Sequence, residues 1–593
     1  MKNISKNICL IKNSNFNSGL SNIPFEWLLF SEPVEILSSY KLEEIHSTLI
    51  KIENFCSQGL WAVGYVNYEA SPYFDYSFKI KKCEDRLPIL WFGIYKKPIL
   101  LNDFSHLINK KRYTFKSWTS SVNYAEYEEA IRKIKNYICA GDTYQVNYTY
   151  NMHSHFGGDP LFCFRELQKN QASKYSAYIE NDFGYILSAS PELFFYQNND
   201  FIISRPMKGT FKRGLYLEDD KRNEGLLKNS EKDKAENLMI TDLIRNDIGR
   251  VALYGTVKVD SLFDIEKYET VFQMTSTISA KTDKHPLDVF SSLFPCGSVT
   301  GAPKIRTMEI IAELEKEPRG IYTGAIGYFG PDKNACFNVA IRTIFIKKDN
   351  NEAIYGVGGG IVADSDSVKE FNETITKSQI LFRNFPEFCL LETIRWSPEE
   401  GFFLLDEHIK RMKNSATYFD FKFDEKMIIA QLKEREKTFP ENTLKIRLLL
   451  ARDGSIEIQF SSFKMSDDLI WTVALASEPI DCDNPFFYHK TTNREIYDNL
   501  RKDMKDVDEV ILYNKNNEIT EGTITNVVVE INGKKITPPV SSGLLAGTFR
   551  EYLLEKGIIY EGIIYIDELK RADQIWLINS LRGWIKAILK NVS

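Results

Sequence analysis

Apolar residues in the first ~115 positions occur in short runs separated by polar turns, as in WAVGYVNYEA (61–70) and LPILWFGIY (87–95). Similar runs, YSAYIE, GYILSA, ELFFYQ and FIISR, follow between residues 175 and 205. Short apolar runs bounded by turn residues are typical of β-strands. The N-terminal part of the chain is therefore predicted to be rich in strands.

Longer periodic segments predict helices between these strands. Residues 124–139 place apolar side chains three and four positions apart, as on one face of an amphipathic helix. Charged helices are predicted over about 232–250 and 367–382. The runs NVAIRTIFIKK (338–348) and EAIYGVGGGIV (352–362) predict two adjacent strands, with Arg342 inside the first.

The segment RNFPEF (383–388) is the predicted linker, because its proline interrupts a helix and a new strand pattern starts at Leu390. The rest of the chain mixes strand patterns (LLETIRW, LKIRLLLAR, TNVVVEI) with the helical pattern DEHIKRMKNSATYF. We therefore predict an α+β fold with two domains, residues 1–383 and 384–593. A chain of 593 residues is also too long for one hydrophobic core.

Composition narrows the functional classes. Hydrophobic residues make up 43% and charged residues 26%, as in ordinary globular proteins, and the net charge of −6 argues against a nucleic-acid-binding surface. The sequence contains no run of about 18 apolar residues, so no membrane-spanning helix is predicted. Nine cysteines without a CxxC pair, and a start without a signal-peptide pattern, predict reduced thiols and a cytoplasmic location.

Two predicted helices carry carboxylates that do not fit a simple solvated face. In 232–250, the apolar residues Leu238, Ile240, Leu243 and Ile248 leave no single apolar stripe, so some acidic groups would face the interior. In the last helix of the domain, Glu370, Glu373 and Lys377 share one face. Carboxylates from two helices would suit Mg²⁺, which takes one or two of them plus substrate oxygens and waters. The alternative is an ordinary solvated charge run.

Two further features indicate an anionic ligand. The cluster GVGGGIV (356–362) lacks the last glycine of a dinucleotide-binding GxGxxG, but its backbone N–H groups could hold a carboxylate. Arg342 lies within an apolar run, and an arginine is seldom buried there without an anionic partner.

Five motifs in order resemble the chorismate-utilising family, which includes anthranilate, aminodeoxychorismate and isochorismate synthases. They are SPELFF (190–195), AENLMITDLIRND (235–247), FPCGSVTGAPKIRTMEIIAELE (294–315), RGIYTGAIGY (319–328) and GVGGGIVADSDSVKEFNET (356–374). The resemblance covers about 120–383 and implies the family's fold. It also implies chorismate as substrate and Mg²⁺ as cofactor.

The resemblance assigns roles to particular positions. Glu236 and Glu370 match the Mg²⁺ ligands, and Glu192 matches the general acid that helps the C4 hydroxyl to leave. The groups that match the binders of the substrate carboxylates, and a further lysine on the substrate side, are Thr300, Tyr322, Arg342, the amides of Gly358, Gly359 and Gly360, and Lys377.

Two positions discriminate within the family. Gln145 replaces the lysine base of water-using relatives, and because an amide cannot abstract a proton, this favours an ammonia user. Lys208, in RPMKGT, stands where aminodeoxychorismate synthases carry a nucleophilic lysine and anthranilate synthases a small residue. The alternative for Lys208 is an exposed turn lysine. Gln273 departs from the histidine common in the family, so any role of an imidazolium there is not carried over.

The resemblance also implies a partner. Ammonia normally reaches this family from a glutamine amidotransferase, and no motif of that domain is visible in this chain, so a separate subunit is expected. LFSEP (29–33) matches the tryptophan feedback motif of relatives poorly, and regulation by tryptophan is not predicted. Neither nucleic acid nor membrane is an expected partner.

The C-terminal motifs DEHIKRMKNSATYF, HKTTNR, EITEGTITNVVV, ITPPVSSGLLAGTFR and INSLRG resemble the fold-type IV pyridoxal-phosphate family. That resemblance covers about 389–587 and implies pyridoxal 5′-phosphate as cofactor. Lys490 matches the Schiff-base lysine and Glu521 the partner of the pyridine nitrogen. The groups that match the phosphate cradle are Arg411, the N–H groups of Thr548 and Phe549, and the Ser580 hydroxyl.

Together the two resemblances imply conversion of chorismate and ammonia to 4-amino-4-deoxychorismate, then loss of pyruvate to give 4-aminobenzoate for folate biosynthesis. Arg494 and NSLRG (579–583) favour the lyase over an aminotransferase. The usual first hairpin of the second family is missing, so the first domain or a second subunit, as in a homodimer through the C-terminal domain, would cover that side. The alternative is an anthranilate synthase-like domain fused to an aminotransferase or to an inactive lyase-like module.

Overall fold

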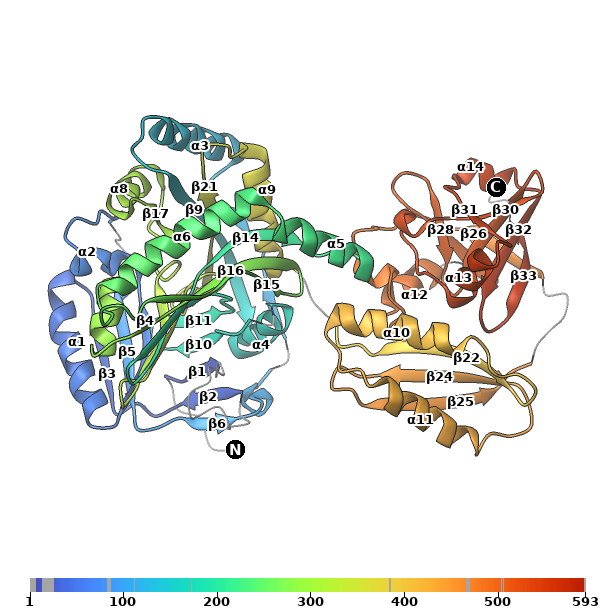
Figure 1. Ribbon diagram of the computed structural model, residues 1–593, viewed down its shortest axis with the longest axis horizontal. Helices are drawn as coiled ribbons and strands as arrows, with labels where there is room; N and C mark the ends of the chain where they lie inside the picture. The colour runs from blue at the N-terminus through green and yellow to red at the C-terminus, as the bar shows by residue number, and fades with distance from the viewer. Residues whose placement is uncertain are drawn as a thin grey trace. The chain divides into compact units, whose positions relative to one another are not determined.

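The computed structural model describes residues 7–12, 26–82, 87–110, 112–171, 173–382, 386–464, 470–502, 504 and 506–590. The chain forms two compact units, which are described separately (Figure 1). The first consists of residues 1–212 and 224–385, and the second of 213–223 and 386–593. The predicted boundary after residue 383 lies two residues before the division in the structure, but residues 213–223 were expected in the first unit and belong to the second.

Hydrogen bonds and an ion pair explain why residues 213–223 belong to the second unit. The guanidinium of Arg213 pairs with the carboxylate of Asp220 at 2.7 Å and donates to the carbonyl of Tyr418 at 2.8 Å. The hydroxyl of Tyr418 in turn donates to the carbonyl of Gly214 at 2.7 Å. The helix that follows, α5 (Leu217–Lys228), starts in this segment. Contacts of this kind join residues far apart in sequence, so a strand and helix pattern does not show them.

The first unit contains two large antiparallel sheets. Among the described residues, the first sheet has eleven strands. In spatial order they are β17 (Gly301–Ala302), β9 (Gln145–Gly158), β21 (Glu352–Ile361), β20 (Thr343–Lys347), β11 (Gly184–Ser188), β10 (Ala177–Glu180), β1 (Cys9–Lys12), β2 (Trp27–Phe30) and β6 (Ile99–Leu101), with β7 (Tyr113–Phe115) and β8 (Thr119–Ser120) paired to β9.

The second sheet has ten strands in the described part of the chain. In spatial order they are β14 (Met207–Lys212), β16 (Val271–Lys281), β13 (Phe201–Arg205), β12 (Leu193–Asn198), β19 (Ala335–Val339), β18 (Ala325–Phe329), β4 (Trp61–Val66), β5 (Leu90–Tyr95) and β3 (Glu35–Ser39), with β15 (Lys258–Lys267) paired to β16. The strands predicted between residues 175 and 205 are confirmed as β10 to β13.

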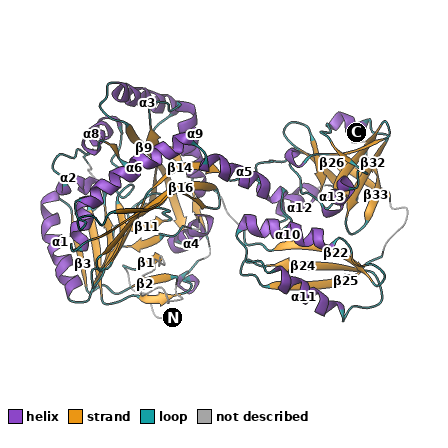
Figure 2. Ribbon diagram, viewed as in Figure 1, coloured by secondary structure: helices purple, strands orange, loops and turns teal. Residues whose placement is uncertain are grey.

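Helices cover the outer faces of the two sheets (Figure 2). They are α1 (Leu42–Ser57), α2 (Ser71–Phe74), α3 (Tyr124–Cys139), α4 (Pro160–Gln171), α6 (Glu231–Gly249), α7 (Pro286–Leu293), α8 (Lys304–Leu314) and α9 (Ser367–Ser378), with the 3₁₀ turns η1 (Tyr68–Ala70), η2 (Ser105–Leu107), η3 (Gly297–Val299) and η4 (Gln379–Leu381). The helices predicted over 124–139, 232–250 and 367–382 correspond to α3, α6, and α9 with η4.

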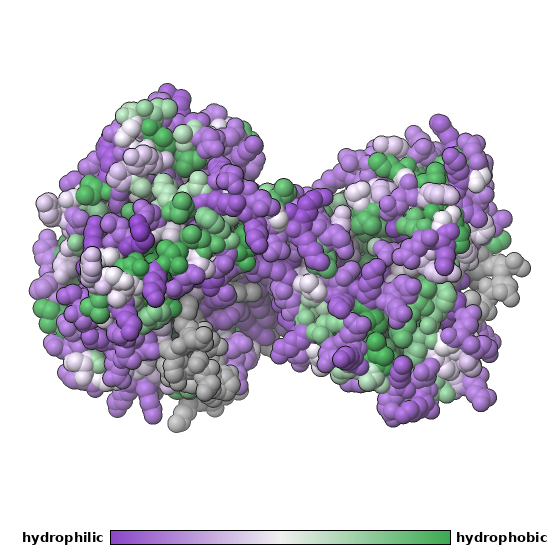
Figure 3. Space-filling model, in the orientation of Figure 1, coloured by the Kyte–Doolittle hydropathy of each residue, from purple (hydrophilic) through white to green (hydrophobic). Residues whose placement is uncertain are grey.

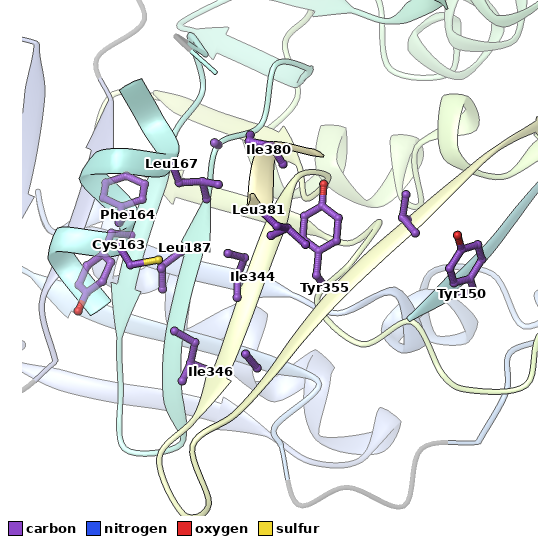
Figure 4. Packing of buried hydrophobic residues seen from close by; sticks show 14 of the residues in the cluster. Tyr150, Cys163, Phe164, Leu167, Leu187, Ile344, Ile346, Tyr355, Ile380 and Leu381 are labelled. Atoms are coloured by element: carbon purple, nitrogen blue, oxygen red, sulfur yellow. The ribbon is translucent and has the colours of Figure 1, made fainter. Parts of the chain in front are cut away.

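Three hydrophobic clusters hold these layers together. One joins facing strands of the two sheets, for example Ile179 of β10 and Tyr65 of β4. The second packs α3, α4 and α8 on the first sheet, and Figure 4 shows Phe164 and Leu167 of α4 beside Leu187 of β11. The third packs α1, α6 and α7 on the second sheet. The strands therefore bury both faces, as expected for the middle layers of a four-layer unit.

The strand predicted across Arg342 is wrong. β19 ends at Val339 and β20 begins at Thr343, and Arg342 lies between them with a φ of 50°. A positive φ is costly for a residue with a side chain, so such a conformation is found where surrounding contacts or function require it. The turn separates strands that belong to different sheets, which an apolar run alone does not indicate.

The second unit contains a small and a large sheet. In the described residues the small sheet has the order β23 (Gly401–Phe402), β22 (Leu390–Ser397), β24 (Leu444–Leu450), β25 (Ile456–Ser462). The large, mixed sheet has the order β28 (Ile519–Gly522), β27 (Glu509–Tyr513), β26 (Ile470–Leu475), β33 (Gly583–Leu589), β32 (Gln574–Asn579), β29 (Asn526–Ile531), β30 (Lys534–Thr537), β31 (Tyr560–Glu561).

Helices of the second unit accompany both sheets, with α10 on β22 and α11 beside β25. They are α10 (Leu405–Phe419), α11 (Glu425–Glu436), α12 (Glu495–Lys502), α13 (Thr548–Glu555) and α14 (Ile566–Lys570), with the 3₁₀ turns η5 (Pro485–Phe487) and η6 (Val540–Ser542). Helices and strands thus occur in both units, which confirms the predicted α+β class.

The surface visible in Figure 3 is mostly polar on both units, and apolar residues gather there only in small groups. Among the described residues, no helix has the length and hydrophobicity needed to span a membrane. The eight described cysteines form no disulfide.

Candidate active sites

A cavity of about 600 Å³ in the first unit gathers most of the residues predicted for the first site. The predicted residues that line it are Glu192, Lys208, Glu236, Tyr322, Arg342, Gly358, Gly359, Gly360, Glu370 and Lys377. They come from β14, β21, α6, α9 and the turns before β12, β18 and β20. Gln145 and Thr300 are the two predicted residues that do not line this cavity.

Lys208 of β14 and Gln145 of β9 meet at Gly360 of β21. A methyl group added at Gly360 would overlap both the Nζ of Lys208 and the Nε2 of Gln145, so glycine is required for this approach. The Gln145 side chain is fully buried, and neither of its polar atoms has a hydrogen-bond partner among the described residues. A buried amide without partners calls for a bound group that supplies them.

Burial lowers the pKa of Lys208, while the nearby Glu236 opposes this shift and Lys377 adds to it. A lowered pKa leaves a larger fraction of the amine neutral and therefore able to attack carbon. The exposed-turn alternative for Lys208 is inconsistent with its position in the wall of the cavity.

Glu192, between β11 and β12, is almost fully buried. The Oγ of Ser298 donates to its Oε1 at 2.6 Å. Burial raises the pKa of Glu192 to about 7, against the opposing effects of Ser298 and Lys208. A carboxyl with this pKa carries a proton in a substantial fraction of molecules near neutral pH, as a general acid requires.

Carboxylates from α6 and α9 line the same cavity. Burial raises the pKa of Glu236 and of Glu370, and the latter accepts a hydrogen bond from Ser365 at 2.8 Å. Glu373 pairs with Lys377 at 2.8 Å, which lowers its pKa, and Lys377 also donates to the carbonyl of Gly358 at 2.9 Å. Charged carboxylates with raised pKa favour a bound cation.

No group of three or more His, Cys, Asp or Glu side chains that could hold a metal is found in the described part of the chain. Mg²⁺ does not need such a group, because it commonly takes one or two carboxylates together with substrate oxygens and water. Glu236 and Glu370 therefore fit Mg²⁺ that is bound jointly with an anionic substrate, and do not fit a closed structural metal site.

Arg342 and Tyr322 lie at another wall of the cavity. Arg342 is buried, its Nη1 donates to the amide oxygen of Gln171, and it forms no ion pair with any described carboxylate. Burial lowers its pKa, so an anion bound here would restore favourable charge pairing. The ring of Tyr322 packs so closely on Gly356 that a methyl group there would overlap it.

Thr300 does not line the cavity, and its role in holding a substrate carboxylate stays a prediction. Its hydroxyl donates to the carbonyls of Cys296 and Gly297, both at 3.2 Å, within its own turn. Its carbonyl accepts a hydrogen bond from the N–H of Asn147 at 2.8 Å, and the preceding Val299 lines the cavity instead. Thr300 thus shapes the turn beside the cavity wall.

A second cavity, of about 200 Å³, lies in the second unit. All six residues predicted for the second site line it: Arg411, Lys490, Glu521, Thr548, Phe549 and Ser580. The structure therefore brings together residues from α10, β28, α13 and two connecting segments, as the resemblance implied.

Lys490 has no hydrogen-bond partner for its Nζ among the described residues. Burial lowers its pKa to about 8, with a further contribution from Arg411, against Glu392. A lysine amine that is neutral in a good fraction of molecules near pH 8 can form a covalent bond with an aldehyde. This fits the aldehyde of pyridoxal phosphate.

Glu521 is buried, and its carboxylate accepts hydrogen bonds from the Tyr497 hydroxyl at 2.7 Å and the Leu545 N–H at 3.2 Å. Burial raises its pKa to about 8 despite these donors and Lys490. A cation placed next to Glu521 would offset the cost of a buried charge. The protonated ring nitrogen of pyridoxal phosphate is a cation of this kind.

A cradle for a phosphate surrounds the start of α13. The helix begins at Thr548 after Gly547, where a methyl group would overlap the side chain of Asn526. The guanidinium of Arg411 donates to Glu392 at 2.9 and 2.6 Å and to the carbonyl of Ala546 at 3.2 Å. Helix N–H groups together with an arginine suit a phosphate group.

Glu392 holds Arg411 in place through two hydrogen bonds, and the sequence did not predict this role for it. Burial alone would raise its pKa, but Arg411 and His408 lower it to about 2, so it stays ionised. The Nδ1 of His408 lies 2.7 Å from its Oε2. The sequence feature that could have indicated Glu392 is an acidic residue within the apolar strand LLETIRW. Ser298, two residues before Thr300 in its motif, and Tyr497 were also missed.

Comparisons with known proteins agree with this geometry. The sequence profile of the chorismate binding enzymes matches residues 26–383, which is more than half of the chain. The chain belongs to the chorismate-binding enzymes. The profile of the class IV amino-transferases matches residues 389–588.

Two relatives of known name illustrate the similarity. Aminodeoxychorismate synthase component 1 of Escherichia coli is 36% identical over 340 residues, which cover 53% of this chain and 75% of the relative. Anthranilate synthase component 1 of Aquifex aeolicus is 40% identical over 276 residues, which cover 46% of this chain and 56% of the relative.

The crystal structure of anthranilate synthase component I from Streptococcus pneumoniae shares the fold. It aligns with a TM-score of 0.53 at 23% identity, over 65% of this chain and 94% of that protein. This likeness concerns the architecture of the chorismate-binding part.

Proposed function

We propose that the chain makes 4-aminobenzoate from chorismate in two steps, an amination in the first unit and an elimination of pyruvate in the second. The observation that carries the proposal is the meeting of Lys208 and Gln145 at Gly360, which lines the first cavity together with Lys208. A nucleophilic lysine beside a neutral amide favours amination through a lysine adduct. A lysine base would be expected instead in an enzyme that activates water.

In the first step, the neutral amine of Lys208 attacks C2 of chorismate and the C4 hydroxyl leaves as water. Glu192 supplies the proton for that water, since burial keeps its pKa near 7. Ammonia then adds at C4 and expels the Lys208 amine from C2. The products of this exchange are 4-amino-4-deoxychorismate and water.

The anionic substrate is held from two sides in this proposal. Arg342 and Tyr322 bind one substrate carboxylate. The backbone N–H groups near Gly359, which lie close to Lys377, bind a substrate carboxylate from the other side. Glu236 and Glu370 would hold Mg²⁺ against the other carboxylate. Bound there, the metal would neutralise negative charge and stabilise the charge that develops in the reaction.

In the second step, Lys490 takes a proton from the ring carbon that carries the amine. Pyridoxal phosphate, when bound, supplies an electron sink that makes this proton acidic. Glu521 would hold its ring nitrogen, and Arg411 with the N–H groups of Thr548 and Phe549, and the hydroxyl of Ser580, would hold its phosphate. Loss of the proton and of pyruvate leaves the aromatic 4-aminobenzoate.

We further propose that ammonia reaches the first unit from a separate glutamine amidotransferase subunit. This rests on the family resemblance. Glutamine should therefore not support turnover by this chain alone, whereas an ammonium salt should. We also propose a cytoplasmic location, from the scattered cysteines and the start without a signal-peptide pattern, and a homodimer through the C-terminal domain, from the missing first hairpin.

Product analysis tests the proposal. The purified chain is incubated with chorismate, Mg²⁺, pyridoxal phosphate and an ammonium salt at raised pH, and the aromatic product is identified by chromatography and mass spectrometry. We expect 4-aminobenzoate together with an equal amount of pyruvate. Anthranilate as the main product would refute the amination at C4. Accumulation of 4-amino-4-deoxychorismate would refute the lyase step alone.

A further inference from the structure

Strand β24 presents two cations to the second cavity. Along Leu444–Leu450 every second residue is buried, while Lys445 and Arg447 lie on the other face of the sheet and are half-buried. Both line the cavity, and Arg447 is paired with Thr393 of β22, which lines it too. Side chains two apart on a strand point the same way, about 7 Å from each other.

A third cation reaches the cavity from the large sheet. Arg582 lies in the turn between β32 and β33, where the side chain of Asn579 accepts hydrogen bonds from the N–H of Leu581 at 3.1 Å and of Arg582 at 2.8 Å. Its guanidinium lies over the rings of Phe463 and Trp471, with centroid distances of 5.3 and 5.4 Å. The turn and the two rings hold this side chain in place.

Among the described residues, the buried carboxylate of Glu509 is near enough to Arg582 to oppose the lowering of its pKa by burial, but it forms no ion pair with it. No described carboxylate forms an ion pair with Lys445, Arg447 or Arg582. The Nε of Arg447 is buried without a hydrogen-bond partner. Burial lowers the pKa of Lys445, and Arg447 and Arg582 lower it further. Mutual repulsion of this kind is costly unless a ligand supplies negative charge.

The charges assigned to the cofactor do not account for this cluster. The carboxylate of Glu392 is engaged by Arg411, and Glu521 accepts from Tyr497 and Leu545. The phosphate cradle consists of Arg411 and the start of α13. Four further positive charges therefore line this cavity of about 200 Å³. One of them, Arg494, donates to the carbonyl of Thr523 and lies over the ring of Tyr497, which leaves Lys445, Arg447 and Arg582 for a ligand.

We propose that Lys445, Arg447 and Arg582 bind the two carboxylates of a ring-shaped dicarboxylate and select such diacids over monocarboxylic amino acids. The inference rests on the proposed function, because the expected product of the first unit carries two carboxylates on one ring framework and an amine that must reach Lys490. An apolar amino acid needs one carboxylate contact and an apolar pocket, so a cluster of cations favours a substrate with two carboxylates.

Binding of unreactive probes tests the site without turnover. The full chain, loaded with pyridoxal phosphate, is titrated with isophthalate, a rigid ring diacid, and with benzoate, its monoacid counterpart. The absorption band of the cofactor reports binding in the second unit only. We expect isophthalate to bind at least about tenfold more tightly than benzoate, since each charge-assisted hydrogen bond contributes a factor of this order.

Variants identify the residues responsible. Lys445→Met, Arg447→Met and Arg582→Met should each reduce the preference for the diacid by about tenfold. The matched control is Lys586→Met, an exposed lysine on β33, which should leave the preference unchanged. An unchanged cofactor band and melting temperature show that the variants fold. The same three variants should raise the KM for 4-amino-4-deoxychorismate more than they lower kcat.

The outcomes separate the site from the proposed function. Equal binding of isophthalate and benzoate by the unaltered chain, or an unchanged preference in all three variants, would overturn the site even if the chain is a lyase. A clear diacid preference that the variants lose, in a chain that forms no 4-aminobenzoate from 4-amino-4-deoxychorismate, would support the site and refute the lyase.

Discussion

Lys208 differs from a surface lysine in its burial and in the group it contacts. Burial lowers the pKa of its amine, and the side chain lies against Gly360 inside the first cavity. Lys208→Ala should therefore reduce ammonia-dependent formation of 4-amino-4-deoxychorismate by about 100-fold or more, because covalent catalysis is lost. Lys212→Ala, on the exposed end of the same strand, is the matched control for initial-rate assays. Wild-type rates in Lys208→Ala would exclude the nucleophile role.

The pKa of Glu192 predicts a pH dependence. As a general acid it must carry its proton, and the protonated fraction falls as pH rises through about 7. Because Lys208 must at the same time be neutral, the amination rate, divided by the concentration of free ammonia, should decline only above the pKa of both groups. Glu192→Gln should be slower by about 100-fold and lack this decline. A profile that keeps the same limb in the variant would assign the titration to another group.

At the scale of elements, the pairing of β21 with β9 brings Gly360 next to the reacting groups. Gly360→Ala would place a methyl group on the Nζ of Lys208 and the amide of Gln145. We expect it to abolish the amination while pyridoxal-phosphate binding is retained. Gly249→Ala, at the end of α6, is the matched control, because a methyl group there would have no atom within 4 Å. Equal loss of activity in both variants would contradict this explanation.

Helices α6 and α9 each contribute one expected metal ligand. Glu236→Gln and Glu370→Gln should each abolish Mg²⁺-dependent amination, because a neutral amide binds Mg²⁺ far less well than a carboxylate. Conversion of supplied 4-amino-4-deoxychorismate should continue, because Glu236 and Glu370 belong to the first unit and this reaction is assigned to the second. Parallel assays of the two half-reactions check this. A variant that aminates chorismate normally would remove its residue from the metal site.

Local pattern predicted elements better than it predicted how they meet. The helix at residues 124–139 followed from its apolar spacing and begins after the cap at Asn123. The turn at Arg342 and the placement of residues 213–223 did not follow, because both depend on contacts between segments far apart in sequence.

The candidate sites show the same division. Motif resemblance gave Lys208, Glu192 and Lys490, whose cavities the structure then provides. The motif NSLRG contains Arg582, but the resemblance did not assign this residue a role, and its neighbours Phe463 and Trp471 are far from it in sequence. The resemblance also did not indicate that Lys445 faces the cavity. A motif identifies residues whose roles are shared with relatives. The balance of positive and negative side chains around a cavity can be determined only from the structure.

At the scale of the whole molecule, the central claim is that one chain carries two successive reactions. Each unit has its own cavity, its own buried lysine and its own expected cofactor. A change confined to one unit should therefore stop one step and leave the other running. Lys490→Ala is the sharpest such change, because it removes the amine that takes the proton in the second step.

The most direct measurement is a chromatographic time course of Lys490→Ala with chorismate, Mg²⁺ and an ammonium salt. The account predicts consumption of chorismate at the wild-type rate, accumulation of 4-amino-4-deoxychorismate, and no 4-aminobenzoate or pyruvate. An independent aminodeoxychorismate lyase added to the mixture should restore both products. Formation of 4-aminobenzoate by the variant alone at the wild-type rate would contradict the assignment of the second unit as the lyase.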